Sequence, residues 1–324
     1  MLIEAWQRRG AGAWLLRPIA GLFGLVAGAR RQAYARGWRK QHRLPIPVVV
    51  VGNVVAGGAG KTPVVIALVR HAQARGWAVG VVSRGHGRRT KDGQVVAAQS
   101  DPRDVGDEPL LIHRATGAPV VVDADRVAAG RRLLAEHPGT RLIIADDGLQ
   151  HLRLARDVEI CVFDDRGVGN GWLLPAGPLR EPWPRRCDLV LHTGERPAFA
   201  GFRGRRTLAS TAIDRDGHTI ALTELATRDD LVAVAGIAQP QRFFDMLRGH
   251  GLRVQRCIAL PDHHDYTHWT PPDNAQLLCT EKDAAKLWAR APTALAVPLD
   301  FSIEPAFFEA LDARLSSFDG SEAA

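Results

Sequence analysis

The sequence has 324 residues, of which 46% are hydrophobic and 24% are charged. This balance excludes a disordered chain, and the length suits two domains or one large α/β domain with additions. The four cysteines lie far apart and form no CxxC pair. This spacing argues against a disulfide framework or a zinc ribbon and favours a reducing compartment.

The net charge of +7 is distributed unevenly along the chain. Residues 5–91 contain 16 Lys and Arg and no Asp or Glu. The other residues contain 26 Lys and Arg (42 less 16) against 35 Asp and Glu. A basic first quarter beside an acidic remainder favours a phosphate-rich partner, either nucleic acid or an anionic membrane surface. A general preference for Arg would explain the excess of Arg but not the missing acids.

Residues 10–29 form a glycine-rich apolar stretch that is just long enough to span a bilayer as a helix. Arg17 lies near its middle, where it would cost roughly 2.5–3.5 kcal/mol, and Pro18 follows. Six basic residues within positions 30–43 instead favour a helix that lies on an anionic membrane surface. The alternatives are a cleaved signal peptide, which conflicts with the nucleotide site described below, and a nucleic-acid-binding segment, which no nucleic-acid fold signature accompanies.

From residue 46 onwards, apolar runs typical of buried strands alternate with helical patterns. The predicted strands are residues 46–51, 79–82, 119–122, 142–145, 159–163 and 189–192. The predicted helices are residues 64–74, 109–116 and 126–136. This alternation indicates a doubly wound parallel sheet with helices on both faces. Residues 166–186, with four glycines and four prolines, are predicted to form a loop.

A second strand–helix series follows a weakly patterned stretch at residues 194–228, where a hinge is expected. Its predicted strands are residues 231–235, 254–260, 276–279 and 294–299. Its predicted helices are residues 241–248, 283–290 and 305–316. We therefore expect a membrane-associated segment at 1–44, a nucleotide-binding domain at 45–200 and a smaller α/β domain at 201–324.

The strongest local signal is a glycine-rich loop between a predicted strand and a predicted helix. It reads Gly52-Asn53-Val54-Val55-Ala56-Gly57-Gly58-Ala59-Gly60-Lys61-Thr62-Pro63. Glycines let backbone N–H groups surround a phosphate, a lysine here reaches the terminal phosphates, and the threonine hydroxyl can bind Mg²⁺. A strict P-loop has glycine where this chain has Val55, and the dinucleotide-binding fingerprint lacks its third glycine. We predict that Gly52, Asn53 and the residues from Ala56 to Pro63 bind nucleotide.

Carboxylates that suit a metal or an acid–base role follow other predicted elements. The strand at 142–145 ends in Asp146-Asp147, as in a Walker B motif, although an Asp-Gly turn alone would look the same. Asp107 and Glu108 precede a predicted helix, where capping is the simplest role. The segment Asp262-His263-His264-Asp265 is compatible with a metal site, an acid–base group or a surface loop. A guanine-specific GTPase is disfavoured, because Thr280-Glu281-Lys282-Asp283 does not have the NKxD spacing.

Together these motifs resemble the tetraacyldisaccharide 4′-kinase family, the lipid A 4′-kinases of Gram-negative bacteria. Seven motifs occur in one order over almost the whole chain. They are the glycine-rich loop, Ser83-Arg84-Gly85, Gly106-Asp107-Glu108-Pro109, Asp146-Asp147-Gly148-Leu149-Gln150-His151, Leu174-Pro175-Ala176-Gly177-Pro178-Leu179-Arg180-Glu181-Pro182, Pro261-Asp262-His263 and Thr280-Glu281-Lys282-Asp283. One departure is His86, where the family usually has Tyr.

The resemblance implies an ATP-dependent kinase that phosphorylates the 4′-hydroxyl of a tetraacylated glucosamine disaccharide 1-phosphate to give the 1,4′-bisphosphate. It also implies a P-loop α/β/α domain joined by a β-hinge to a smaller α/β domain, with an N-terminal helix on the inner membrane. Asp107 is the implied catalytic base and His263 its partner. The metal ligands assigned to Mg²⁺ are Thr62, Asp146, Asp147 and Glu108. The assigned substrate-binding or supporting residues are Arg84, Gln150, His151, Arg180 and Glu181.

The expected partners are the lipid A disaccharide precursor and the anionic surface of the inner membrane on its cytoplasmic face. Neither nucleic acid nor an obligate protein partner is expected. One alternative is a P-loop ATPase or kinase with a soluble substrate, whose activity would not depend on membrane or detergent. Another is a nucleotide-dependent membrane-binding module, which would bind ATP but phosphorylate no lipid.

Overall fold

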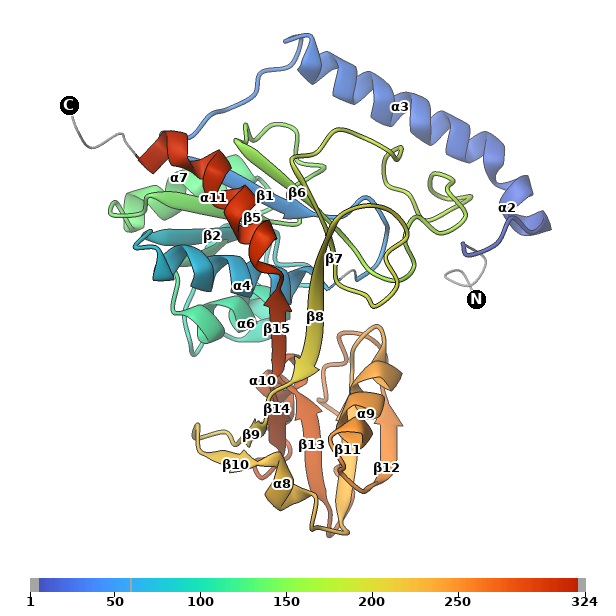
Figure 1. Cartoon of the computed structure of the whole chain (residues 1–324), viewed down its shortest axis with the longest axis vertical. Coiled ribbons are helices and arrows are strands. Elements are labelled where there is room, and N and C mark those ends of the chain that lie inside the picture. Colours follow the sequence, from blue (N-terminus) through green and yellow to red (C-terminus); the bar gives the residue numbers. More distant parts are fainter. Residues whose placement is uncertain (1–5, 59, 320–324) are drawn as a thin grey trace.

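The structure is a computed structural model that describes residues 6–58 and 60–319. Figure 1 shows two α/β units, one above the other, with a long N-terminal helix lying across the larger unit. Two antiparallel strands, β8 (Phe202–Leu208) and β15 (Leu299–Ile303), run between the units. The predicted hinge region therefore contains the first of these two connecting strands.

The larger unit is built on a nine-stranded sheet in the order β15-β8-β7-β6-β1-β5-β2-β4-β3. The strands not yet introduced are β1 (Val48–Gly52), β2 (Val79–Ser83), β3 (Gln94–Val96), β4 (Val120–Val122), β5 (Leu142–Asp146), β6 (Val158–Phe163) and β7 (Leu189–His192). All neighbours from β8 to β4 pair in parallel, whereas the edge strands β3 and β15 are antiparallel. The predicted doubly wound parallel sheet is confirmed.

Helices cover both faces of this sheet, which explains why β1 consists of buried residues throughout. Val49 and Val51 belong to one core cluster, and Val48 and Val50 belong to the other. The first cluster packs against α4 (Lys61–Ala74), α6 (Asp107–Thr116) and α11 (Pro305–Asp319), and the second against α7 (Arg126–Glu136). The short helix α5 (Pro102–Val105) directly precedes α6.

The smaller unit has a six-stranded sheet in the order β10-β9-β14-β13-β11-β12. Its strands are β9 (Thr211–Ile213), β10 (Thr219–Ala221), β11 (Leu231–Ala235), β12 (Val254–Ala259), β13 (Gln276–Thr280) and β14 (Leu295–Val297). Its helices are α8 (Leu222–Leu225), α9 (Pro240–Gly249) and α10 (Glu281–Leu287). The four strands from β14 to β12 are parallel, so this unit repeats the architecture of the larger one on a smaller scale.

Two details differ from the sequence prediction. The predicted strand at 294–299 is two strands, because Pro298 lies between β14 and β15 and proline has no N–H to donate to a sheet. The sequence predicts the C-terminal helix within the smaller domain at 201–324, but in the structure this helix packs on the larger sheet. Phe307, Leu311 and Leu315 of α11 are buried in the first core cluster of the larger unit.

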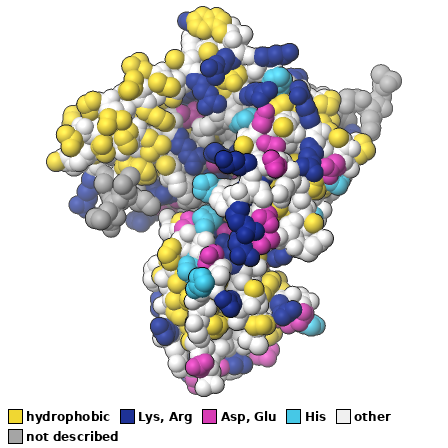
Figure 2. All heavy atoms as spheres, turned by 180° about the vertical axis from the view of Figure 1, so that it is seen from behind, with side chains coloured by type: hydrophobic (Ala, Val, Ile, Leu, Met, Phe, Trp, Pro, Cys, Tyr) yellow, Lys and Arg dark blue, Asp and Glu magenta, His cyan; other side chains and the backbone are white. Residues whose placement is uncertain are grey.

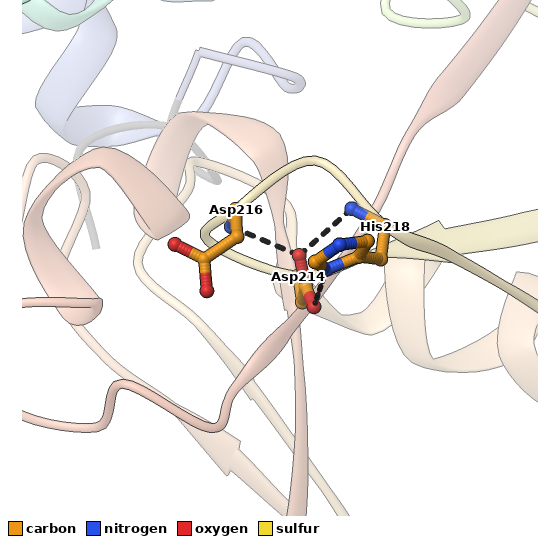
Figure 3. A group of neighbouring side chains, drawn as sticks. All are labelled: Asp214, Asp216 and His218. Atoms are coloured by element: carbon orange, nitrogen blue, oxygen red, sulfur yellow. Dashed lines mark hydrogen bonds and ion pairs between the residues drawn. The ribbon is translucent and has the colours of Figure 1, made fainter.

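The turn between β9 and β10 holds Asp214, Asp216 and His218 close together, as Figure 3 shows. Asp214 accepts hydrogen bonds from the backbone N–H groups of Asp216 and His218, each at 2.9 Å. The His218 ring lies 2.9 Å from the second Asp214 oxygen. These contacts close an exposed hairpin turn, and they account for the proximity of the three side chains.

The N-terminal segment forms α2 (Ala11–Leu15) and α3 (Arg17–Ala35). Eight large apolar side chains along these helices and just beyond them face solvent, and Figure 2 shows their patch at the upper left. They are Trp14, Leu15, Ile19, Leu22, Phe23, Leu25, Val26 and Trp38. Within the described residues, neither helix nor any other combines the length and apolar character needed to cross a bilayer.

Candidate active site

The glycine-rich loop connects β1 to α4, as the sequence predicts. Gly57 and Gly60 have φ angles of +92° and +67°, which side chains with a Cβ rarely adopt. Asn53 is fully buried and holds the loop in shape, because its amide nitrogen donates to the carbonyl oxygens of Val55 and Gly57 at 2.6 and 3.2 Å. Asn53 therefore supports the part of the loop from Val55 to Gly57.

The other predicted nucleotide-binding residues lie in this loop or at its two ends. The N–H of Ala56 donates to the carbonyl oxygen of Pro178 at 2.7 Å, and the carbonyl of Gly58 accepts from Arg166 at 2.7 Å. Ala59 lies outside the described residues. Gly52 ends β1, and the first turn of α4 contains Lys61, Thr62 and Pro63.

Lys61 places a cation beside the loop and the N-terminus of α4. Its side chain is only 10% exposed, and its ammonium group lies 3.3 Å from both Asn53 Oδ1 and Asp147 Oδ1. Thr62, one residue further on, is also buried. A buried cation, glycine amides and a helix N-terminus together are suited to a phosphate group.

Asp146 lies at the carboxyl end of β5, directly beside β1, where its register partner is Val51. One carboxylate oxygen accepts from the Ser83 hydroxyl at 2.9 Å. The other oxygen is buried and has no hydrogen-bond partner among the described residues. Burial, followed by the negative charge of Glu108, raises the pKa of Asp146 to about 7. An unpartnered buried carboxylate oxygen beside a second carboxylate suits a divalent cation.

The Asp147 carboxylate contacts two positively charged side chains. Its carboxylate contacts Lys61 at 3.3 Å and Arg180 at 3.1 and 3.3 Å. Burial opposes its ionisation, but Lys61 and Arg180 together lower the pKa of Asp147.

The four residues assigned to the metal do not all converge in this structure. Across residues 6–58 and 60–319, only Asp214, Asp216 and His218 form a group of three acidic, His or Cys side chains with ligand atoms all within 4.8 Å of one another. The carboxylate oxygens of Glu108, Asp146 and Asp147 therefore do not all lie within 4.8 Å of one another. Among the predicted metal ligands, Asp146 has a buried oxygen without a hydrogen-bond partner in the described part of the chain, and burial, together with the negative charge of Glu108, raises its pKa.

Three of the predicted supporting residues form a network behind the loop. Gln150 donates to the Asn53 carbonyl oxygen at 3.1 Å and to Glu181 at 2.8 Å, and it accepts from Arg180 at 3.3 Å. Glu181 is buried and also accepts from Arg31 of helix α3 at 3.4 Å. The network thus connects the glycine-rich loop to the N-terminal helix.

The other two supporting residues lie outside this network. Arg84 is exposed immediately after β2. His151 lies 3.4 Å from Asp125, and burial, followed by the positive charge of Arg126, lowers the pKa of His151 to about 4. His151 is therefore neutral at physiological pH.

Asp107 and His263 meet where the two units face each other, a region in which Figure 2 shows charged and His side chains gathered. His263 Nδ1 lies 3.0 Å from Asp107 Oδ2, although the residues are 156 positions apart. Asp107 is 6% exposed; burial opposes its ionisation, but hydrogen bonds from His263 and Lys286 lower the pKa of this carboxyl. Asp107 is not the N-cap of α6, because Gly106 holds that position and Asp107 is the first residue of the helix, in the acidic first turn.

Sequence reasoning missed one residue of this cluster. Lys286, on α10 of the smaller unit, donates to Asp107 Oδ2 at 2.8 Å. The available signal was its position four residues after Lys282, in the helix that begins at the motif Thr280–Asp283. His86, the position that departs from the family pattern, also lies near this cluster, with its ring centre 5.9 Å from that of His263.

The sequence profile of the family described as Tetraacyldisaccharide-1-P 4'-kinase matches residues 12–316. Tetraacyldisaccharide 4'-kinases of Acidovorax ebreus (strain TPSY) and Polaromonas naphthalenivorans (strain CJ2) are each 56% identical to the chain, over 321 and 328 residues. Both alignments cover 98% of this chain and 95% of the relative. The chain belongs to this kinase family.

The fold agrees with that assignment. A crystal structure of LpxK from Aquifex aeolicus in complex with ATP is similar at a TM-score of 0.83 and 29% sequence identity, covering 94% of this chain and 99% of that chain. The family, the α/β fold and the kinase activity on the lipid A precursor that the sequence predicted are therefore confirmed.

Proposed function

We propose that this 4′-kinase uses Asp107 as the base that accepts the proton of the 4′-hydroxyl. As the hydroxyl oxygen bonds to the γ-phosphorus of ATP, the bond between that phosphorus and the β–γ bridging oxygen breaks, and ADP leaves. A sugar hydroxyl is a weak nucleophile, so a carboxylate within hydrogen-bond reach assists its attack. The observation that carries the proposal is the 3.0 Å contact between Asp107 and His263, two residues from different units.

ATP is the phosphoryl donor in this proposal, and the glycine-rich loop holds its phosphates. The solved LpxK relative is described as a complex with ATP. In this chain, the loop amides, the N-terminus of α4 and the buried Lys61 ammonium supply the positive potential that the phosphates need. Asn53, which also contacts Lys61, keeps that ammonium at the loop.

Mg²⁺ fits beside this loop. Thr62 and Asp146 would hold it, with Glu108 and Asp147 nearby, and the unpartnered oxygen of Asp146 is the observation that supports the fit. When bound, Mg²⁺ neutralises charge that develops on the phosphate oxygens during transfer. The carboxylate–hydroxyl bond between Ser83 and Asp146 orients the free oxygen of Asp146.

The lipid approaches from the N-terminal helices. The eight exposed apolar side chains and the basic residues of α3 suit attachment to the cytoplasmic face of an anionic inner membrane. A cavity of about 360 Å³ lies between α3 and the loop at 166–186, lined by Ala20, Leu173, Leu179 and Trp183 among others. We assign this cavity to an acyl chain of the substrate.

Assembly of the base from two units also protects ATP. Asp107 belongs to the larger unit, whereas His263 lies in the loop that follows β12 of the smaller unit. The pair forms only when the units are in contact. An enzyme that completes its base on closure limits hydrolysis of ATP by water before the lipid arrives.

The experiment uses purified protein, ATP labelled on the γ-phosphate and the disaccharide 1-phosphate lipid in mixed micelles. The wild-type protein should label the lipid. Asp107→Asn should lower kcat by roughly 10²–10⁴-fold, because an amide cannot accept the proton. ATP binding should be unchanged. Label that appears on the lipid at the wild-type rate in Asp107→Asn would remove Asp107 from this role.

A further inference from the structure

Two lysines on α10 converge on the Asp107–His263 pair. Lys286 Nζ lies 2.8 Å from Asp107 Oδ2, and Lys282 Nζ lies 3.4 Å from His263 Nε2. Their side chains are only 10% and 17% exposed. Residues four apart share one face of a helix, and α10 packs against α6, the helix that Asp107 begins. One short helix therefore presents two cations to the proposed base.

The chemistry of the groups fixes the direction of each hydrogen bond. An ammonium group has no acceptor, so Lys282 must donate to His263 Nε2. An imidazole that accepts at Nε2 carries its proton on Nδ1, and here Nδ1 donates to Asp107 Oδ2. Lys286 donates to the same oxygen. Among the described residues, Asp107 Oδ1 has no hydrogen bond, which leaves it available for the substrate hydroxyl.

The helix that carries these lysines is itself fixed to the His263 loop. The Thr280 hydroxyl caps α10 by accepting from the N–H of Asp283 at 3.2 Å, and it donates to the Asp283 carboxylate at 2.7 Å. That carboxylate accepts from the N–H of Gly236, at 3.1 Å to each oxygen. The carbonyl of Gly236 in turn accepts from the N–H of His263 at 3.1 Å.

Lys286 completes this connection. Besides Asp107, its ammonium group contacts the carbonyl oxygens of His263 and His264, at 3.4 and 3.2 Å. His263 has a φ of +62°, a conformation that a non-glycine residue adopts rarely and that needs support from its surroundings. Three contacts to one ammonium group therefore link the carboxylate of the larger unit to the strained loop of the smaller unit.

We infer that Lys286 and Lys282 are positioning residues for phosphoryl transfer. Lys286 holds the Asp107 carboxylate so that Oδ1 faces the substrate, and Lys282 keeps His263 in the tautomer that donates to Asp107. The inference rests on the proposed role of Asp107 as base. It gives the motif Thr280–Asp283 a function: the motif anchors the helix that places both lysines at the contact between the units.

The test measures kcat, KM for ATP, KM for lipid and melting temperature of Lys286→Met and Lys286→Arg. Lys286→Met keeps the length of the side chain and removes its charge. It should lower kcat by roughly 10–100-fold, the loss expected for one hydrogen bond to a charged group, with little change in KM for ATP. Lys286→Arg restores a cation and should recover part of that loss. Lys91→Met, at an exposed lysine, is the matched control and should keep wild-type kinetics.

The same substitution in an Asp107→Asn background separates positioning from a structural role. If Lys286 acts through Asp107, Lys286→Met should lower kcat less than about threefold further in that background. An equal loss in both backgrounds would overturn the inference, as would wild-type kcat in Lys286→Met. Asp107→Asn with full activity would instead overturn the proposed base, so the two failures are distinguishable.

Lys282→Met provides a second arm if Lys286→Met does not fold. Lys282 also pairs with Asp262 at 3.2 Å and is more exposed than Lys286, so its replacement disturbs the fold less. Lys282→Met should lower kcat in the wild-type background and have little further effect beside His263→Ala. A kcat for Lys282→Met equal to that of the wild type would contradict the part of the inference that concerns the tautomer.

Discussion

Asp146→Asn should stabilise the metal-free protein. Asp146 is 2% exposed, and burial together with Glu108 raises its pKa from 3.8 to about 7. The folded state therefore binds this proton more tightly than the unfolded state does. As the pH rises from about 4 to about 7, the unfolded chain releases its proton first, and the folded state loses stability.

The size of this loss follows from the shift in pKa. About three pKa units, at about 1.4 kcal/mol each, correspond to roughly 4 kcal/mol above pH 7. Asparagine cannot ionise, and its side-chain oxygen can still accept from Ser83. The variant should therefore match the wild type near pH 4 and become more stable than the wild type as the pH rises, with the difference levelling off above pH 7.

The assay is urea unfolding between pH 4 and pH 8.5 in EDTA, repeated with Mg²⁺. Added Mg²⁺ should stabilise the wild type and have little effect on Asp146→Asn, because the cation binds only the folded site. Asp216→Asn, at an exposed turn carboxylate, should change the free energy of unfolding by less than about 0.5 kcal/mol at every pH. An Asp146→Asn variant that is less stable than the wild type at pH 8 in EDTA would contradict this prediction, as would a difference in stability that does not vary with pH.

Three further predictions follow from the other parts of the site. Lys61→Ala should abolish lipid phosphorylation, because the phosphates lose their buried cation; near-normal turnover would exclude the loop as the nucleotide site. Neutralising Arg30, Arg36 and Arg39 together should weaken sedimentation with anionic vesicles most at low salt, where screening is weak, and should leave the melting temperature unchanged; Arg31 is kept because it contacts buried Glu181, and binding that does not depend on salt would argue against electrostatic attachment. His263→Ala combined with Asp107→Asn should lower kcat far less than the product of the single effects, since the residues act as a unit.

The sequence predicted those parts of the fold whose signal is local. The valine-rich run of β1 and the glycine-rich loop after it lie next to each other in the chain, so position and function could both be inferred. Asp146 could be placed beside this loop because β1 and β5 are adjacent parallel strands, whose carboxyl ends lie at one edge. The strand β8 was missed because four of its seven residues are charged or polar and its exposure alternates, unlike a buried run.

Contacts between segments that lie far apart in the chain could not be predicted from local sequence patterns. The pairing of Asp107 with His263 was implied by family resemblance alone, since spacing gives no reason to connect residues 156 positions apart. The helical spacing places Lys286 on the same face of α10 as Lys282, but the contact of Lys286 with Asp107 depends on how the units pack, which the spacing does not indicate. The cations around Asp147 were not foreseen either, because Arg180 comes from a loop without regular periodicity.

The central claim is that Asp107 accepts the proton of the 4′-hydroxyl, and single-turnover kinetics test it most directly. Wild-type protein and Asp107→Asn are each mixed with labelled ATP and excess lipid, and the transfer of label to lipid is followed in time. Asp107→Asn should bind ATP and lipid as tightly as the wild type and transfer the phosphoryl group roughly 10²–10⁴-fold more slowly. Transfer at the wild-type rate by the Asn variant would contradict the account.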